Sequence, residues 1–389
     1  MTDHLMNTYL PLPVAFERGE GAWLWDEDGK RYLDAISGLG VCGLGHAHRE
    51  VAKVIADQAA RLVHTGNLVR IPWQERLADE LAGITGMDRA FFGNSGAEAI
   101  ECALKIARIL GHQRSLEKPG VIVMEKSFHG RTLAALSATG SRKVQAGFEP
   151  LVSGFFRAPF GDLEAVEKIA RGGAPIAAVL VEPIQGEAGI RVPPPGYLAG
   201  LRALCNREGW ALIFDEIQSG LCRTGKWYAH EHEDIRPDIL TTAKALGNGL
   251  PIGACLAKGP AATAFRPGSH GSTFGGNPLV TRVACTVLDI MRSEDLAGKA
   301  ARTGGFLLDA FRERLAQDGK VRDIRGRGLM IGIELDRDAN ALKERALEAG
   351  LLLNVTQERV IRLLPPLVID AEQAEEIVDT VCSLIASLD

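Results

Sequence analysis

The sequence predicts an α/β protein with a large, mostly parallel sheet covered by helices on both faces, and a smaller α/β domain formed by the N- and C-terminal segments. Two observations support this fold class. Short apolar runs without polar alternation, such as Ala177–Val181 and Ala211–Phe214, are typical of strands buried on both faces. These runs alternate with helical patterns along the chain, and strands that alternate with helices form parallel sheets.

The first elements follow in chain order. Aromatic-rich stretches lie on either side of Asp28-Gly29 in the segment Gly21–Asp34, which predicts a β-hairpin. Arg89–Phe92 is predicted as a strand, followed by a helix from about Ala97 to Leu110. Further strands of the large sheet are predicted at Val121–Met124, Ala177–Val181 and Ala211–Phe214.

The C-terminal part has a different pattern. Short strands are predicted at Gly328–Leu335, Leu351–Asn354 and Val360–Leu364, before an amphipathic helix at Ala371–Leu388. The N-terminal segment has no β-α alternation of its own, so we expect its hairpin to join this C-terminal unit. The predicted boundaries are 1–48 for the N-terminal segment, 49–278 for the large domain and 279–389 for the small domain.

Composition excludes several classes of function. The 389 residues are 46% hydrophobic and 24% charged, with a net charge of −5, so we expect a globular chain that binds no nucleic acid. No apolar run approaches the roughly 20 residues of a membrane-spanning helix, and charged residues and prolines interrupt any N-terminal secretion signal. The seven cysteines are scattered and form no C-x-x-C pair, which predicts a cytoplasmic protein.

The segment Leu212–Gly253 carries the strongest chemical signal. Asp215 directly follows a buried strand, and in open α/β sheets ligands lie at the carboxyl ends of strands. Lys244 follows 29 residues later, between two alanines and just before Gly247-Asn248-Gly249. Desolvation makes such an amine nucleophilic, so it can bind an aldehyde, and an aspartate can keep a pyridine nitrogen protonated. Pyridoxal phosphate needs both groups; the alternatives are a solvated lysine and a helix-capping aspartate.

Three loops add to this pattern. Gly93–Ala99 lies between a strand and a helix, where backbone N–H groups and a serine hydroxyl are suited to bind a phosphate, the alternative being a simple serine cap. Ser127–Thr132 offers a phenylalanine to stack on a ring and an arginine to bind a carboxylate. Gly271–Pro278 is glycine-rich with two hydroxyls, and is either a further phosphate contact or an ordinary loop.

Together these motifs resemble the class III aminotransferases, pyridoxal-phosphate enzymes of fold-type I. The similarity covers nearly the whole chain, through GEGAWLWDEDGKRYLDAISG, FFGNSGAEA, FHGRT, VEPIQGEAG, FDEIQSG, DILTTAKALGNGLPIGA, HGSTFGGNP and IRLLPPL in that order. It implies a sheet of the seven-stranded type and a homodimer with shared active sites. Within the family, FHGRT, SHGSTFGGNP and the chain length are most similar to members that act on N2-acetyl-L-ornithine.

The resemblance assigns cofactor contacts. It implies that Lys244 carries the cofactor, that Asp215 pairs with the pyridine nitrogen and that Gln218 binds the ring hydroxyl oxygen. The remaining implied cofactor contacts are the phosphate-binding Ser95, Gly96 and Ala97, Phe128 on the ring face, and Thr273, which binds phosphate in the neighbouring subunit.

It also assigns substrate contacts. Arg131 and Ser272 match positions that contact the α-side of acetylornithine, and Arg362 matches the arginine that binds the α-carboxylate of 2-oxoglutarate. Glu187 matches a glutamate that pairs with this arginine while the amino donor is bound. From the residues alone, the favoured interpretation of Glu187 is a solvated loop carboxylate, and that of Arg362 is a surface charge at the end of a strand.

The implied reaction transfers the terminal amino group of N2-acetyl-L-ornithine to 2-oxoglutarate, giving N-acetyl-L-glutamate 5-semialdehyde and L-glutamate in arginine biosynthesis. The alternatives are another ω-amine donor (succinylornithine, ornithine, γ-aminobutyrate or N-succinyl-diaminopimelate), an aminomutase, and a non-enzymatic binding protein. The chain departs from the family pattern at Asn67–Arg70, at Asn248 and at Thr356-Gln357.

Metal binding is not expected. His46-Ala47-His48 and His230-Glu231-His232 are possible ligand pairs, but neither has a third ligand at a suitable spacing.

Overall fold

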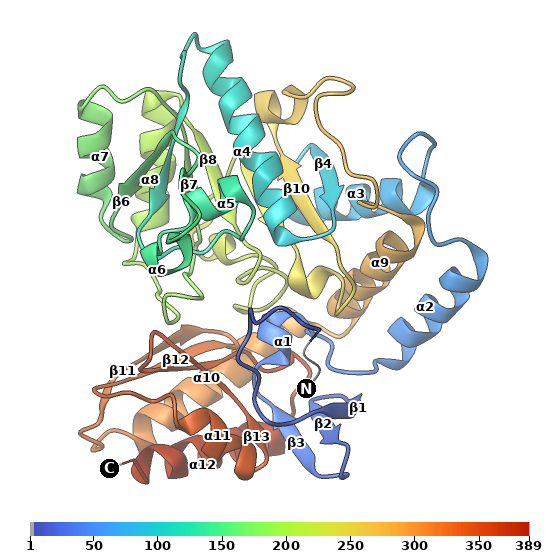
Figure 1. Cartoon of the computed structure of the whole chain (residues 1–389), viewed down its shortest axis with the longest axis vertical. Coiled ribbons are helices and arrows are strands. Elements are labelled where there is room, and N and C mark those ends of the chain that lie inside the picture. The colour runs from blue at the N-terminus through green and yellow to red at the C-terminus, as the bar shows by residue number, and fades with distance from the viewer. Residues whose placement is uncertain (1–3, 389) are drawn as a thin grey trace.

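The computed structural model describes residues 4–388, and its centre is a seven-stranded sheet (Figure 1). The strand order is β4(Arg89–Gly93), β10(Gly253–Ala257), β9(Ile239–Thr242), β8(Ala211–Asp215), β7(Ile176–Val181), β5(Gly120–Met124) and β6(Phe155–Ala158). The strand β10 is antiparallel to both of its neighbours, and the other pairs are parallel. The predicted α/β class and mostly parallel sheet are confirmed, whereas β6, β9 and β10 were not predicted.

Helices cover both faces of this sheet. The helix α4(Gly96–Gln113) packs on one face, and α7(Leu163–Arg171) and α8(Tyr197–Glu208) pack on the other. Along β7, Ala178 and Leu180 join the core under α4, while Val179 and Val181 join the core under α8. Each large buried side chain contributes about 1.5–3 kcal/mol, so both faces of the strand favour apolar residues. This two-sided burial explains the apolar runs seen in the sequence.

The N-terminal hairpin is part of a second sheet. Its order is β1(Phe16–Glu20), β2(Trp23–Asp26), β3(Arg31–Asp34) and β13(Leu351–Leu352). The turn is set by Gly29, at φ +81°, and by the Asp26 carboxylate, which accepts hydrogen bonds from the backbone N–H groups of residues 28 and 30. Since β13 pairs parallel to β3, the N-terminal hairpin lies against the C-terminal part of the chain.

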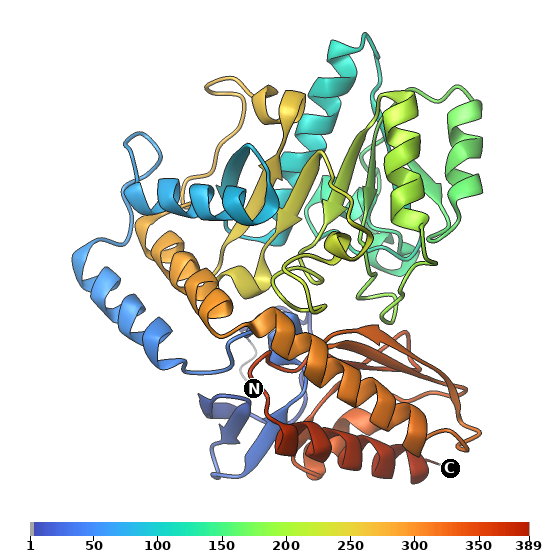
Figure 2. The same ribbon diagram turned by 180° about the vertical axis from the view of Figure 1, so that it is seen from behind.

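The third sheet is antiparallel, in the order β11(Val321–Arg327), β12(Met330–Leu335), β15(Val360–Leu363) and β14(Asn354–Thr356). One prediction needs correction here, because Leu351–Asn354 is not one strand. The chain leaves the N-terminal sheet after Leu352 and enters this sheet at Asn354, so β13 and β14 pair with different partners. The helices α10(Leu296–Arg314), α11(Leu342–Glu348) and α12(Ala371–Ala386) accompany this part of the chain (Figure 2).

The long helix α9(Pro278–Ser293) links the two parts. Asn277 caps it, and it packs against α2(Arg49–Arg61) and α3(Pro72–Thr85) beside the large sheet. The remaining short helices are α1(Ser37–Gly40), α5(Leu133–Ala138), α6(Arg142–Gln145), η1(Ala229–Glu233), η2(Lys244–Leu246) and η3(Gly259–Thr263). Within residues 4–388, no helix has the length and apolar character needed to cross a membrane.

Candidate active site

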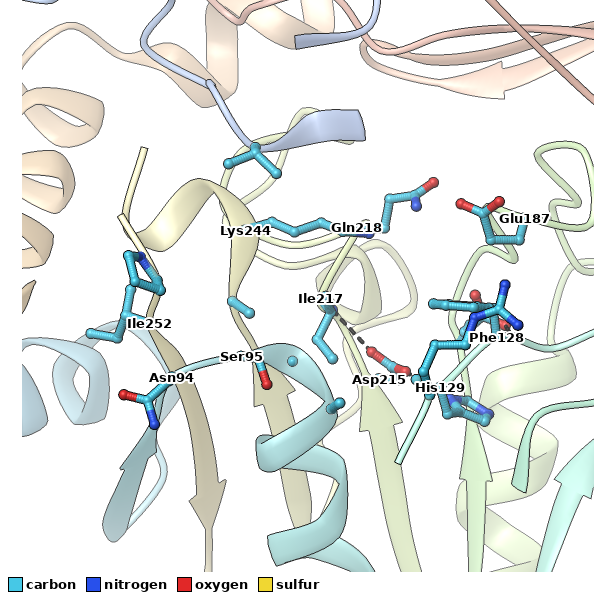
Figure 3. Close-up of a pocket in the computed structure, with 18 of the residues that line it drawn as sticks. Asn94, Ser95, Phe128, His129, Glu187, Asp215, Ile217, Gln218, Lys244 and Ile252 are labelled. Carbon is cyan, nitrogen blue, oxygen red and sulfur yellow. Dashed lines mark hydrogen bonds and ion pairs between the residues drawn. The ribbon is translucent and has the colours of Figure 1, made fainter. Parts of the chain in front are cut away.

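A cavity of about 450 Å³ opens at the carboxyl ends of β5, β7 and β8, on the side that faces the C-terminal sheet (Figure 3). It brings together most of the predicted site residues from segments far apart in the sequence. The predicted residues that line it are Ser95, Gly96, Ala97, Phe128, Arg131, Glu187, Asp215, Gln218 and Lys244.

Lys244 lies just beyond β9, and its side chain extends across the cavity toward Gln218 (Figure 3). Its backbone adopts φ +46°, a left-handed conformation that costs a β-carbon-bearing residue of order 1 kcal/mol and is common at functional sites. Burial lowers the pKa of the Lys244 amine, against the opposing charges of Glu187 and Asp215. Burial therefore makes the neutral, nucleophilic form of this amine more accessible than it is in an exposed lysine.

Asp215 ends β8, and both of its oxygens have partners. Oδ2 lies 2.7 Å from Nδ1 of His129, and Oδ1 accepts a hydrogen bond from the backbone N–H of Ile217 at 3.1 Å. His129 is fully buried, and among the described residues its Nε2 has no partner. Sequence reasoning missed His129; its position directly after Phe128 in FHGRT was the available signal.

Glu182 was also missed. It lines the cavity at the end of β7, where burial, and after it the charge of Asp215, raise the pKa of its carboxyl well above the usual range. Its carboxyl group accepts hydrogen bonds from the backbone N–H of Phe128 at 3.1 Å and of Gly186 at 3.4 Å. Glu182 thus holds the segment that presents Phe128 to the cavity.

The loop before α4 forms a cradle of backbone N–H groups. Ser95 is the N-cap of this 18-residue helix, and its hydroxyl accepts a hydrogen bond from Glu98 N at 3.2 Å. Glycine at position 96 allows close packing, because a Cβ there would lie 2.7 Å from Cδ1 of Ile217 and would force that side chain to shift. The helix N-terminus and its close approach to the cavity suit an anion such as a phosphate.

Glu187 and Arg362 form an ion pair at the edge of the cavity, with Nη1 of Arg362 2.5 Å from Oε1 of Glu187. Arg362, on β15, is 2% exposed, and its Nε and Nη2 donate to Oδ1 of Asn354 at 3.1 and 2.9 Å. Burial opposes ionisation of Glu187, but the charge and hydrogen bond of Arg362 outweigh burial and lower the pKa of Glu187. A surface-charge interpretation of Arg362 is therefore wrong.

Gln218 lies beside the loop that carries Glu187. Its Oε1 is buried and has no hydrogen-bond partner among the described residues. A Cβ at Gly186 would lie 1.9 Å from this oxygen, so a larger residue there would displace the Gln218 amide.

Three predicted residues do not line this cavity: Arg362, which pairs with the lining residue Glu187, and two residues of the loop before α9. Ser272 and Thr273 line a neighbouring space of about 360 Å³ with Asn94, Glu98 and Glu101. The Ser272 hydroxyl bonds to Asn94 Nδ2 at 3.2 Å and accepts from Gly275 N at 3.0 Å, while Thr273 is exposed. Neither residue reaches the lysine cavity within one chain.

One histidine of each predicted pair has an acidic partner. His46 pairs with Asp34 at 2.8 Å, and His230 pairs with Glu216 at 3.0 Å. Over residues 4–388, no group of three or more acidic, histidine or cysteine side chains is arranged to hold a metal ion.

Comparison with known proteins decides the family. The family model described as aminotransferase class-III matches residues 5–385. The chain belongs to the class III aminotransferases. It is 53% identical to an acetylornithine aminotransferase of Nitrosomonas europaea, over 98% of this chain and 97% of that protein.

Solved structures agree. An ornithine aminotransferase of Toxoplasma gondii superposes with a TM-score of 0.96 at 36% identity, covering 99% of this chain and 93% of that one. An acetylornithine aminotransferase of Elizabethkingia anophelis superposes with a TM-score of 0.89 at 34% identity, covering 99% of this chain and 97% of that one. The resemblance predicted from the motifs is confirmed.

Class III aminotransferases are pyridoxal-phosphate enzymes, so the cofactor of this chain is pyridoxal phosphate. The cavity fits this group. It offers a desolvated lysine amine, a helix N-terminus for a phosphate, and two buried polar atoms without partners among the described residues, His129 Nε2 and Gln218 Oε1.

Proposed function

We propose that this aminotransferase moves the terminal amino group of N2-acetyl-L-ornithine to 2-oxoglutarate, giving N-acetyl-L-glutamate 5-semialdehyde and L-glutamate in arginine biosynthesis. The observation that carries this proposal is the ion pair beside Lys244 between the buried Arg362 and the half-buried Glu187. The names of similar proteins, such as the one from Nitrosomonas europaea, support the choice of donor.

The pair fits two unlike substrates in one cavity. The reacting carbon of the donor carries no carboxylate, so an unpaired arginine beside it is unfavourable, and Glu187 neutralises that charge. The reacting carbon of 2-oxoglutarate carries a carboxylate, which can replace Glu187 on the Arg362 guanidinium. Rotation of one side chain thus changes what the cavity accepts. Arg131, which lies 5.5 Å over the Phe128 ring, is proposed to bind the distal carboxylate of the donor. Ser272 is proposed to contact the same side of the donor across the subunit boundary, since it does not line the cavity of its own chain.

We propose that the following residues hold the cofactor: Ser95, Gly96, Ala97, Phe128, Asp215, Gln218, Lys244 and, in the neighbouring subunit, Thr273. Pyridoxal phosphate supplies an electron sink for negative charge at the reacting carbon of the substrate. Asp215 would accept a hydrogen bond from the protonated ring nitrogen, and the Lys244 amine would take the proton from the substrate carbon and deliver it to the cofactor. Phe128, Ser95 and Gln218 orient the group.

We further propose a cytoplasmic homodimer. Thr273 and Phe274 are exposed in the single chain, Phe274 by 62%. This exposure supports a shared site, because both side chains are available to contact a neighbouring subunit. The seven unpaired cysteines support a reducing compartment.

Residues 49–278 are proposed as the large domain, and residues 1–48 and 279–389 as the small domain. The helix α9, which packs on α2 and α3, connects the two domains.

Half-reactions of the yellow holoenzyme test the function. N-acetylornithine, succinylornithine, ornithine and γ-aminobutyrate are added in separate cuvettes without 2-oxoglutarate, and the loss of cofactor absorbance is followed. We expect N-acetylornithine to react fastest. Equal rates with all four amines would indicate a broad ω-aminotransferase, product formation without 2-oxoglutarate over many turnovers would indicate an aminomutase, and no reaction would overturn the proposal.

A further inference from the structure

The strand β14 contacts both members of the Glu187–Arg362 pair. Asn354 and Thr356 are two residues apart, so their side chains lie on one face of the strand, while Val355 points into the core. Asn354 Oδ1 accepts two hydrogen bonds from the Arg362 guanidinium. Thr356 Oγ1 donates to the backbone carbonyl of Glu187 at 2.7 Å. One short strand therefore holds the arginine by its side chain and the glutamate by its backbone.

The turn after β14 adds a second contact to the same carbonyl. Gln357 Nε2 donates to Glu187 O at 2.9 Å, so this oxygen accepts two hydrogen bonds from adjacent residues. Gln357 and Glu358 both adopt positive φ, 52° and 65°, which directs the chain back into β15. Thr356-Gln357 is one of the places where the sequence departs from the family pattern.

The loop that carries Glu187 is closed at its base and bound along its outer side. Gln185 and Arg191 pair across the base with backbone hydrogen bonds of 3.0 and 2.9 Å. Arg325 of β11 donates to the carbonyls of Gly189, at 2.7 and 3.0 Å, and of Ile190, at 3.0 Å. Three anchor points, at the carbonyls of residues 187, 189 and 190, hold the loop backbone, and none of these contacts involves the Glu187 side chain.

We infer that Asn354, Thr356 and Gln357 are positioning residues that set the two substrate specificities of this site separately. Thr356 and Gln357 keep the Glu187 carboxylate within reach of Arg362, which the state that accepts the donor requires. Asn354 keeps the guanidinium aimed into the cavity once Glu187 has rotated away, which the state that binds 2-oxoglutarate or glutamate requires. This inference rests on the proposed function of the Glu187–Arg362 pair.

The two groups of contacts predict opposite effects. The double variant Thr356→Val, Gln357→Met keeps the side-chain sizes and removes both hydrogen-bond donors to the Glu187 carbonyl. The loop that carries Glu187 is then held less firmly, so its carboxylate pairs with Arg362 for a smaller fraction of the time. We expect kcat/KM for N-acetylornithine to fall about tenfold in the half-reaction, with the glutamate half-reaction changed less than about threefold. Asn354→Leu removes the acceptor, and we expect KM for glutamate to rise about tenfold, with the N-acetylornithine half-reaction changed less than about threefold.

Both half-reactions are measured on holoenzyme by the loss of cofactor absorbance, at matched cofactor content and with the melting temperature of each variant. Thr356→Ser retains the hydroxyl, and Glu358→Gln changes an exposed side chain of the same turn; both are expected to behave as the wild type. Should the double variant fold poorly, Thr356→Val alone gives the same comparison with one donor removed.

Equal losses in both half-reactions, or no loss in either, would overturn the inference. Glu187→Gln, measured alongside, keeps this outcome distinct from failure of the proposed function. If Glu187→Gln affects the two half-reactions unequally and the β14 variants do not, the role of β14 alone is refuted. If Glu187→Gln affects both equally, the pair itself is no switch.

Discussion

Nδ1 of His129 and Oδ2 of Asp215 lie 2.7 Å apart in a buried pair that joins the loop after β5 to the end of β8. The second carboxylate oxygen is held by the backbone of Ile217, so the orientation of Asp215 is fixed from both sides. A carboxylate held in this way is pre-oriented for a ring nitrogen and need not reorganise during the reaction.

His129→Phe is therefore expected to lower kcat by about 10²-fold, because it removes one partner of a buried charged hydrogen bond. His129→Asn places an amide nitrogen near the position of Nδ1 and should recover most of the activity. The measurement is kcat for the complete reaction at equal bound cofactor. Indistinguishable rates for His129→Phe and the wild type would show that Asp215 is oriented without the histidine.

Lys244→Ala is expected to abolish turnover, by at least about 10²-fold, since it removes the amine that moves the proton. The cofactor remains bound non-covalently through the phosphate cradle and the Asp215–His129 pair, so it should be lost on gel filtration more readily than from the wild type. The measurements are turnover and cofactor content before and after filtration. Substantial turnover by Lys244→Ala would refute the assignment.

The lowered pKa of Glu187 predicts a pH dependence of stability. A carboxyl whose pKa is lower in the folded state than its ordinary value of 4.5 contributes stability that is complete above pH 4.5 and is lost as the pH falls through the folded-state pKa. The melting temperature of the wild type should exceed that of Glu187→Gln at pH 7, and this difference should shrink below pH 4.5. A difference that stays constant down to acid pH would contradict the ion pair.

Arg223 provides a test of the contact between the two parts of the chain. It is 2% exposed, burial lowers the pKa of its guanidinium to about 10, and its Nη1 donates to the carbonyls of Leu329, at 3.1 Å, and of Pro365. Arg223→Met leaves both carbonyls without this donor, and we expect a loss of about 2–4 kcal/mol of unfolding free energy.

The urea midpoint at unchanged slope measures this loss. Arg302→Met, at an exposed position, serves as the control and is expected to change the unfolding free energy by less than about 0.5 kcal/mol. Equal midpoints for the two variants would mean that the carbonyls of Leu329 and Pro365 find other donors.

The sequence alone determined the fold class and four strands of the large sheet, and it predicted Lys244 and Asp215 as cofactor-binding residues, which the structure places in one cavity. Those features have local signals: two-sided apolar runs for β7 and β8, a DG turn for the N-terminal hairpin, and a lysine and an aspartate in recognisable motifs. The sequence contains no signal for the antiparallel direction of β10. A short apolar strand has the same residue pattern whether it pairs parallel or antiparallel to its neighbours.

Only the tertiary structure decided which polar residues support the site. His129, Glu182 and Asn354 are unremarkable in the sequence, and they act through contacts with residues that lie between 4 and 86 positions away. Likewise, the division of Leu351–Asn354 between two sheets depends on which strands approach from elsewhere, β3 on one side and β15 on the other. Local sequence sets the conformational preference of a segment, whereas its hydrogen-bond partners are set by the packing of distant segments.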